Sequence, residues 1–175
     1  MYQNTGLLKK LSSFDVAQEL IRNEQVYVEN GKIIVDLSKK IEMVNDLAGY
    51  LAQKVVPTNF WRAVIGLNFN EKPFCQEFSR RANADKDLFV LEGNELLSIN
   101  QEFKGVIGAD VLIVTGLIDD FLLDGLSKQA KELMENRRII KSIKIFTVVD
   151  LSSPQKKDWL EVFSLTRPKD FLAPL

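Results

Sequence analysis

The hydrophobic pattern of the chain switches repeatedly between helical and strand-like periods. Short apolar runs such as 111–118 are typical of strands that are buried on both faces. Asn30-Gly31 lies between two alternating segments and predicts a hairpin turn. The predicted strands are a hairpin over 26–38 and the segments 62–69, 87–93, 111–118, 140–150 and 162–165. The predicted helices are 14–21, 41–55, 73–84, 126–136 and 155–162, while 95–103 is ambiguous and fits an edge hairpin.

Strands that alternate with helices predict an α/β fold with a mostly parallel sheet flanked by helices. Helix 14–21 and hairpin 26–38 predict a small N-terminal hood beside this sheet. The 175 residues are 46% hydrophobic and 27% charged, which fits a single domain over 1–175 with its own core. Ligands of such sheets bind beyond the carboxyl ends of the strands. Asp119 and Asp120 follow the most apolar strand, so their position makes them site candidates.

Composition excludes several classes of function and partner. The net charge of −1 implies no broad cationic surface, so we expect no nucleic-acid partner. No apolar run reaches the roughly 18 residues of a membrane helix, and the N-terminus shows no hydrophobic stretch of signal-peptide length. Cys75 is the single cysteine, which excludes an internal disulfide and fits a reducing cytoplasm. We therefore predict a cytoplasmic protein with no membrane partner.

The absence of histidine limits the chemistry further. It excludes Ser–His and Cys–His nucleophile systems, imidazole metal sites and the usual general base at neutral pH. An enzyme with this composition would rely on carboxylates, Lys, Tyr, backbone dipoles or a hard metal ion. Cys75 is expected to be a small buried residue on the apolar face of helix 73–84.

Two polar segments at predicted strand ends each admit two interpretations. Asp119 and Asp120 suit the first turn of a helix, where acids meet the positive end of the helix dipole. The same carboxylates could instead hold ribose hydroxyls or a Mg²⁺ ion. Gly66 and the polar residues after it could form a plain turn, or could present backbone N–H groups to an anion.

Five segments together carry a family resemblance. They are "YVENGKIIVDLSK", "AVIGLNFNEKPF", "DLFVLEGNELL", "LIDDFLLDGLS" and "VFSLTRPKDFL". In order, they resemble the opening hairpin, the pyrophosphate-side loop, the entry to the flexible basic loop, the phosphoribosyl-binding motif and the closing segment of orotate phosphoribosyltransferases. These enzymes belong to the type I phosphoribosyltransferase class, and the resemblance runs from about Phe14 to Leu172.

The resemblance implies a transfer of ribosyl phosphate from 5-phosphoribosyl-1-pyrophosphate to orotate with Mg²⁺, in a homodimer. Asp119 and Asp120 would steady the ribose hydroxyls as catalytic residues and hold the metal. The 5′-phosphate would lie at a helix N-terminus, and the pyrophosphate would lie at the loop that follows Gly66. The implied phosphate residues are Leu123, Asp124, Gly125, Leu126 and Ser127, and the implied pyrophosphate residues are Gly66, Leu67, Asn68 and Lys72.

The chain departs from the family pattern at the donor site. Leu123 and Asp124 replace the paired hydroxyl residues of the phosphate cradle. An additional carboxylate about 4 Å from a phosphate costs about 1 kcal/mol in water and about 4 at an intermediate dielectric. Residues 87–127 contain eight acids and one basic residue, Lys104, which leaves a net charge of −7 where the family supplies cations. A leaving pyrophosphate would lack its cationic clamp.

The register of the phosphoribosyl-binding motif remains open in the sequence. In one alignment the two family acids correspond to Asp119 and Asp120. In the other, 111–114 is the motif strand and the acids correspond to Thr115 and Gly116, so the site is lost. The sequence therefore predicts an orotate phosphoribosyltransferase-like protein with a degenerate donor site and reduced or lost activity. The alternatives are a non-catalytic nucleotide-binding regulator or dimerisation partner, and a transferase for a less anionic ligand.

Overall fold

The structure, a computed structural model, describes residues 12–55, 63–81, 87–90, 109–136, 140–154 and 160–171. Its N-terminal part, residues 12–37, is the hood, which contains helix α2 (Ser13–Arg22), strands β1 (Val26–Glu29) and β2 (Lys32–Val35), and the residues that connect and follow them. The Ser12 side chain and the Asp15 side chain form a reciprocal capping box that starts α2. The predicted hood is therefore present, and its first helix begins where the serine predicted it.

The hood hairpin turns at the predicted dipeptide. Asn30 and Gly31 have φ values of 50° and 74°, the left-handed conformation that a two-residue hairpin turn requires at both positions. The two strands pair antiparallel, with Val26 opposite Val35. Val26 is buried and belongs to the protein's core, so this edge of the hairpin anchors the hood.

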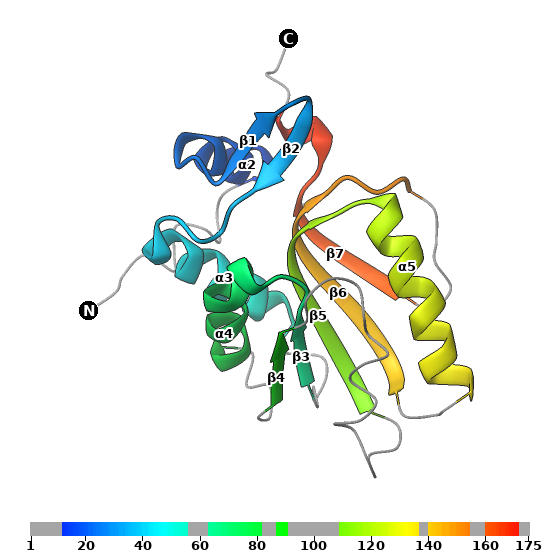
Figure 1. Ribbon diagram of the computed structural model, residues 1–175. Coiled ribbons are helices and arrows are strands. Elements are labelled where there is room, and N and C mark those ends of the chain that lie inside the picture. Colours follow the sequence, from blue (N-terminus) through cyan, green and yellow to red (C-terminus); the bar gives the residue numbers. More distant parts are fainter. Residues whose placement is uncertain are drawn as a thin grey trace.

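Five strands form the main sheet, and every described pairing between them is parallel (Figure 1). Their order across the sheet is β4–β3–β5–β6–β7. The chain therefore enters at β3, continues to β4 at the neighbouring edge, and then returns through β5 and β6 to β7 at the other edge. This confirms the predicted fold class. The strands are β3 (Ala63–Gly66), β4 (Asp87–Val90), β5 (Ala109–Ile118), β6 (Ile140–Asp150) and β7 (Leu160–Thr166).

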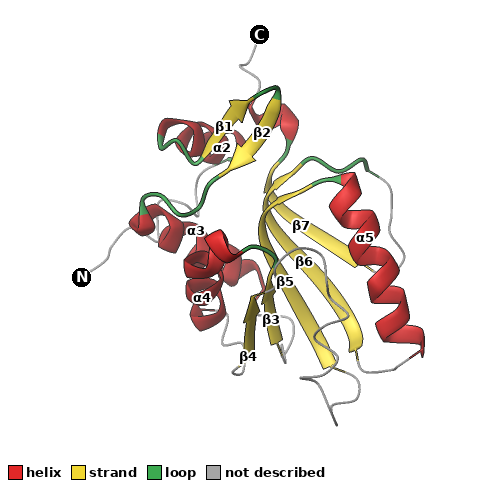
Figure 2. Ribbon diagram, in the orientation of Figure 1, coloured by secondary structure: helices red, strands yellow, loops and turns green. Residues whose placement is uncertain are grey.

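Helices cover both faces of the sheet, because the central strands are apolar on both sides (Figure 2). Along β5, Leu112 and Val114 enter one core cluster, which also contains residues of the hood and of two helices. Val111 and Ile113 point the other way and pack with the apolar side of the third helix. The helices are α3 (Ile41–Val55) and α4 (Lys72–Arg81) on the first face and α5 (Asp120–Lys131) on the second.

The hood lies beyond the carboxyl ends of the strands, and α5 begins at that same edge (Figure 1). Helix α2 of the hood packs against β7 and against the short helical turn that follows β7. The carboxyl edge is therefore the covered end of the sheet, which is where the candidate site residues were expected. The remaining short elements are η1 (Phe69–Glu71), a π-helical turn η3 (Glu132–Asn136) and η4 (Pro168–Phe171).

Two predicted elements differ from the structure. Residues Leu160–Val162 were predicted to end a helix but begin β7, where Glu161 pairs with Lys144 of β6 across a 3.2 Å ion pair. The helix predicted over 126–136 begins earlier, at Asp120. The ambiguous segment 95–103 lies outside the described residues. Within the described part of the chain, no helix has the length and apolarity needed to cross a membrane.

Candidate functional site

The carboxyl edge of the sheet has two levels, because neighbouring strands end at different heights. Gly66, the last residue of β3, pairs with Val114 of β5. Beyond that point β5 continues alongside β6 until Ile118 pairs with Asp150. At about 3.3 Å per residue, the end of β5 lies about 13 Å beyond the end of β3. The two predicted halves of the site, after Gly66 and after Ile118, therefore start at different levels.

The lower level is closed by a contact that we name the Glu71 junction, formed by Glu71, Thr115 and Gly116. The Gly116 backbone N–H donates a hydrogen bond of 2.9 Å to Glu71 Oε1. Glu71 is only 5% exposed, although it is an acidic residue at the end of a surface loop. The Glu71 carboxylate thus accepts the hydrogen bond of a β5 amide next to the end of β3, where the resemblance places the pyrophosphate loop.

The hood closes the junction from above. A Cβ atom added to Gly116 would lie 2.7 Å from Glu71 Oε1, 2.9 Å from Val35 Cγ1 and 3.3 Å from Leu37 Cδ1. At the two shorter distances Glu71 or Val35 would have to move, so glycine at this position permits the close approach of hood and sheet. Leu37 itself is 2% exposed. Side chains from the hood and from η1 therefore fill the space above the end of β3.

Burial changes the acidity of Glu71. Desolvation disfavours the charged carboxylate and raises its pKa from 4.5 to about 7. The Gly116 amide partly offsets this effect because it stabilises the charged form, and the Thr115 hydroxyl does so to a smaller extent. In the structure that hydroxyl donates to the Leu117 carbonyl at 3.3 Å. Among the described residues, Glu71 Oε2 has no hydrogen-bond partner.

Cys75 lies directly beside the junction and is inert. Its Sγ donates weakly to the Val114 carbonyl at 3.7 Å, and the side chain is fully buried on the inner face of α4. Burial, and to a smaller extent the nearby Glu71 carboxylate, raises the pKa of the Cys75 thiol well above its ordinary value. The thiol stays protonated, in agreement with the predicted role as a small core residue.

Asp119 and Asp120 form the upper level, and both are engaged by nearby backbone and side-chain donors. Asp119 is the N-cap of α5, with Oδ1 accepting the Leu122 N–H at 2.8 Å. Asp120 Oδ1 accepts the Ser153 N–H at 2.9 Å, and Asp120 Oδ2 accepts the Ser153 hydroxyl at 2.6 Å. The pair thus ties the start of α5 to the loop after β6, as the helix-capping interpretation predicts for Asp119.

The upper-level residues do not fit a magnesium ion well. Both oxygens of Asp120 already accept hydrogen bonds from Ser153, and Asp119 uses one oxygen for its helix. Nearby, Arg167 Nη2 lies 3.8 Å from Asp150 Oδ2, which brings a cation to this level. No cluster of three metal-ligating side chains occurs within the described ranges. A divalent ion would have to displace these contacts, so we derive no chemistry through one.

The implied phosphate residues lie within α5. The helix begins at Asp120, so the backbone of Leu123 to Ser127 is helical and is not the N-terminal turn. Leu123 and Leu126 are 2% and 0% exposed and pack into the core between α5 and the sheet. The physical reason is the cap: Asp119 satisfies the first free amide and starts the helix before Asp124.

The implied pyrophosphate residues lie on the lower level, where the loop closes on itself. Gly66 and Leu67 are buried, and Asn68 Oδ1 accepts the Asn70 N–H at 2.9 Å. The Asn68 carbonyl accepts the Glu71 N–H at 3.0 Å. Lys72 is exposed at the first position of α4. The structure brings this loop against Thr115 and Gly116 of β5.

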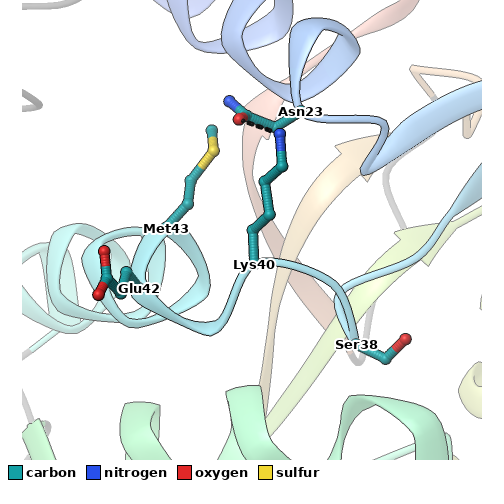
Figure 3. A pocket seen from close by; sticks show the side chains of 5 residues that line it. All are labelled: Asn23, Ser38, Lys40, Glu42 and Met43. Carbon is teal, nitrogen blue, oxygen red and sulfur yellow. Dashed lines mark hydrogen bonds between the residues drawn. The ribbon is translucent and has the colours of Figure 1, made fainter.

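Glu71 was not among the site residues predicted from the sequence. The sequence does place this acidic residue between an apolar strand and a helix, without a basic residue that could pair with it in the protein interior. That combination could have marked it as unusual. A second feature, a pocket of about 530 Å³ between the hood and the start of α3, left no sequence signal (Figure 3). There Lys40 Nζ donates to Asn23 Oδ1 at 2.9 Å, and the Met43 side chain points toward the same asparagine.

Comparisons with known proteins place the fold. No protein-family model matches the chain, and no curated protein matches it in sequence. Among solved structures it is similar to Leishmania donovani UMP synthase, with a TM-score of 0.59, 17% identity, and coverage of 93% of this chain but 38% of that one. It is similar to orotate phosphoribosyltransferase from Aeropyrum pernix, with a TM-score of 0.57, 15% identity, and coverage of 89% and 95%.

A third similar structure is a hypothetical protein from Neisseria gonorrhoeae with bound ppGpp. Its TM-score is 0.53 with 10% identity, and the match covers 72% of this chain and 79% of that one. Identities this low establish the fold alone. The chain therefore has the fold of the type I phosphoribosyltransferases, and the contents of its site must be argued from its own residues.

Proposed function

We propose that this chain is an orotate phosphoribosyltransferase-like protein whose transfer activity is strongly reduced or lost, and which serves as a non-catalytic binding or dimerisation partner. The observation that carries the proposal is the bond between Glu71 and Gly116 at the end of β3. A pyrophosphate at this level would have to displace a buried carboxylate and the hood side chains above it.

The strand register supports the degenerate form of the motif. Because Gly66 pairs with Val114, the residues next to the lower-level loop are Thr115 and Gly116. These are the positions of the family acids in the second alignment, and neither residue carries a carboxylate. Asp119 and Asp120 would then occupy the places of the paired hydroxyl residues, where a negative charge is unfavourable for a 5′-phosphate.

Electrostatics also oppose a polyphosphate donor. When Glu71 is ionised, a phosphate oxygen about 4 Å away meets a repulsion of about 1 to 4 kcal/mol, depending on the local dielectric. When Glu71 is neutral, the repulsion vanishes, but the carboxyl group still fills the donor position at Gly116. Lys72 is the nearest basic residue in sequence, and it is exposed at the start of α4. Among the described residues, the Glu71 junction itself contributes no cation that would support a leaving pyrophosphate.

Orotate-dependent release of pyrophosphate tests this proposal. The protein would be incubated with 5-phosphoribosyl-1-pyrophosphate, Mg²⁺ and orotate beside an active orotate phosphoribosyltransferase. We expect no release above the rate without orotate. Release that depends on orotate and disappears in an Asp119→Asn, Asp120→Asn double variant would overturn the proposal, because it would restore both acids to a catalytic role.

A second candidate function is nucleotide binding at the upper level. Phe121, next to Asp120 in the first turn of α5, is 82% exposed, which offers an aromatic face at the carboxyl edge of the sheet. Aromatic faces stack bases of any kind. The similar hypothetical protein from Neisseria gonorrhoeae has ppGpp bound, which supports a nucleotide as the ligand to test here.

Thermal-shift titrations separate this candidate from the first. A nucleotide-binding regulator should be stabilised by millimolar ppGpp or UMP, and Phe121→Ala should remove the stabilisation. An absent shift, or a shift that Phe121→Ala leaves unchanged, contradicts binding at this aromatic face. Light scattering on the same samples measures the mass, for which the proposal expects a homodimer.

A further inference from the structure

Glu71 is bonded unequally at its two oxygens. Oε1 accepts the Gly116 amide hydrogen, whereas Oε2 is buried and has no partner among the described residues. A carboxylate buried beside one hydrogen-bonded amide and one neighbouring hydroxyl, both neutral, is poorly compensated, because taking a charge out of water costs several kcal/mol. A protonated carboxyl group in the same place avoids most of that penalty. The closed junction therefore favours the neutral acid.

Among the described residues, the groups that face Glu71 provide no charge that would reverse this preference. From α4 it is faced by the Cys75 thiol, which is neutral, while Lys72 on the same helix is exposed. From β5 it is faced by the Gly116 amide and the Thr115 hydroxyl. From the hood side it is approached by two apolar side chains around Gly116, Val35 and Leu37.

The only acid between those two hood residues is turned elsewhere. Asp36 accepts hydrogen bonds from the Ser38 N–H at 3.0 Å and from the Ser38 hydroxyl, and its other oxygen lies 3.7 Å from Lys39 Nζ. These contacts lower the pKa of Asp36, chiefly through the Ser38 hydroxyl, so it stays ionised near neutral pH. Titration at the contact between hood and sheet therefore rests with Glu71.

We propose that Glu71 is a proton-operated latch that holds the hood on the sheet. With the carboxyl group neutral, Val35 and Leu37 pack over Gly116 and the junction stays closed. With the carboxylate ionised, its unpartnered oxygen requires water, and the hood segment above it opens locally to admit solvent. The inference concerns the opening of the fold and holds whether or not the chain binds a phosphoribosyl donor.

The latch operates in the physiological range. Desolvation raises the pKa of Glu71 to about 7, so a modest change of pH near neutrality changes its charge. If opening returns the carboxyl group to its ordinary pKa of 4.5, the opening equilibrium constant rises about tenfold between pH 6 and pH 8. Below pH 5 the latch is shut, and above pH 8 further alkali changes nothing.

Two measurements on the full chain test the latch. The first is the ¹⁵N–¹H resonance of Gly116, whose hydrogen bond to Glu71 makes it a direct reporter of that carboxyl group. We expect it to titrate with a midpoint near 7. The second is hydrogen exchange of the β2 amides, expressed as protection factors so that the intrinsic effect of pH is removed. We expect β2 protection to fall about tenfold from pH 6 to pH 8.

Matched variants separate the latch from general pH effects. Glu71→Gln keeps the shape but cannot ionise, so β2 protection should become independent of pH, whereas Glu24→Gln, at an exposed hood residue, should behave as wild type. A Gly116 midpoint below about 5.5, or a pH dependence of β2 protection that survives in Glu71→Gln, overturns the proposal. The wild-type Gly116 titration decides the question even if Glu71→Gln fails to fold. Failure of donor binding would bear on the proposed function and leave both measurements untouched.

Discussion

The Glu71 carboxylate accepts the Gly116 amide hydrogen at 2.9 Å, and the two residues are 45 positions apart in the chain. This contact joins the loop after β3 to the carboxyl-terminal part of β5, at the edge of the sheet where related folds receive ligands. It places a protein acid, covered by the hood, at the lower level of the site. The fold is therefore retained, while its lower level is closed by the chain's own side chains.

Glu71→Gln should change the dependence of stability on pH. The pKa of Glu71 is raised from 4.5 to about 7 in the folded state, so between these values the unfolded chain releases a proton that the folded chain keeps. The wild-type free energy of unfolding therefore falls as pH rises through this window, by up to about 3 kcal/mol relative to the variant. Urea unfolding at pH 5, 6, 7 and 8 measures this difference. Parallel curves for the two proteins would contradict the assignment.

Gly116→Ala should destabilise the protein by about 1 to 3 kcal/mol, because its methyl group would meet Glu71 Oε1 at 2.7 Å and Val35 Cγ1 at 2.9 Å. In a Glu71→Ala background the loss should be smaller, since one of the two obstacles is gone. A double-mutant cycle by urea unfolding gives the coupling between the two sites. Strictly additive losses would mean that the two residues do not share the crowded space.

Asp119→Ala should lower the stability by about 1 kcal/mol, because the Leu122 amide loses its cap. Asp119→Ser should stay near wild type, since serine is also a good N-cap. Thermal unfolding of the two variants makes the comparison. If both substitutions leave the melting temperature unchanged, the capping role assigned to Asp119 is wrong.

Leu126→Ala should cost about 2 to 5 kcal/mol, because Leu126 is fully buried in the core beneath α5. Ser127→Ala, at the next position but only half-buried, should cost less than about 1 kcal/mol. Urea unfolding distinguishes the two. Equal and small effects would favour the alternative in which both residues border a phosphate cradle on the surface.

The sequence predicted the strands of the sheet well, because Asn30-Gly31 and the apolar run 111–118 are determined by local backbone and burial preferences. It was wrong about Leu160 and Glu161, because amphipathic residues over a short length fit a helix as well as an edge strand. It also left the offset between β3 and β5 undetermined. The pairing of Gly66 with Val114 is set by tertiary packing, and that offset decides which residues share one level of the site.

The roles of the acidic residues were likewise predictable only where the local sequence determines them. The capping interpretation of Asp119 could be derived locally, because an acid before an amphipathic segment is a typical helix start. The burial of Glu71 could not be derived, because its partner Gly116 and its covering residue Leu37 come from distant segments. The contents of the candidate site were therefore less predictable than the fold that carries it.

Calorimetric titration of the protein with 5-phosphoribosyl-1-pyrophosphate in the presence of Mg²⁺ tests the central claim most directly. If Glu71 and the hood close the lower level, millimolar donor should release no heat beyond dilution at pH 7. Saturable binding with one donor per chain, weakened when Asp119 and Asp120 are replaced by asparagine, would contradict the claim and return the acid pair to a working donor site.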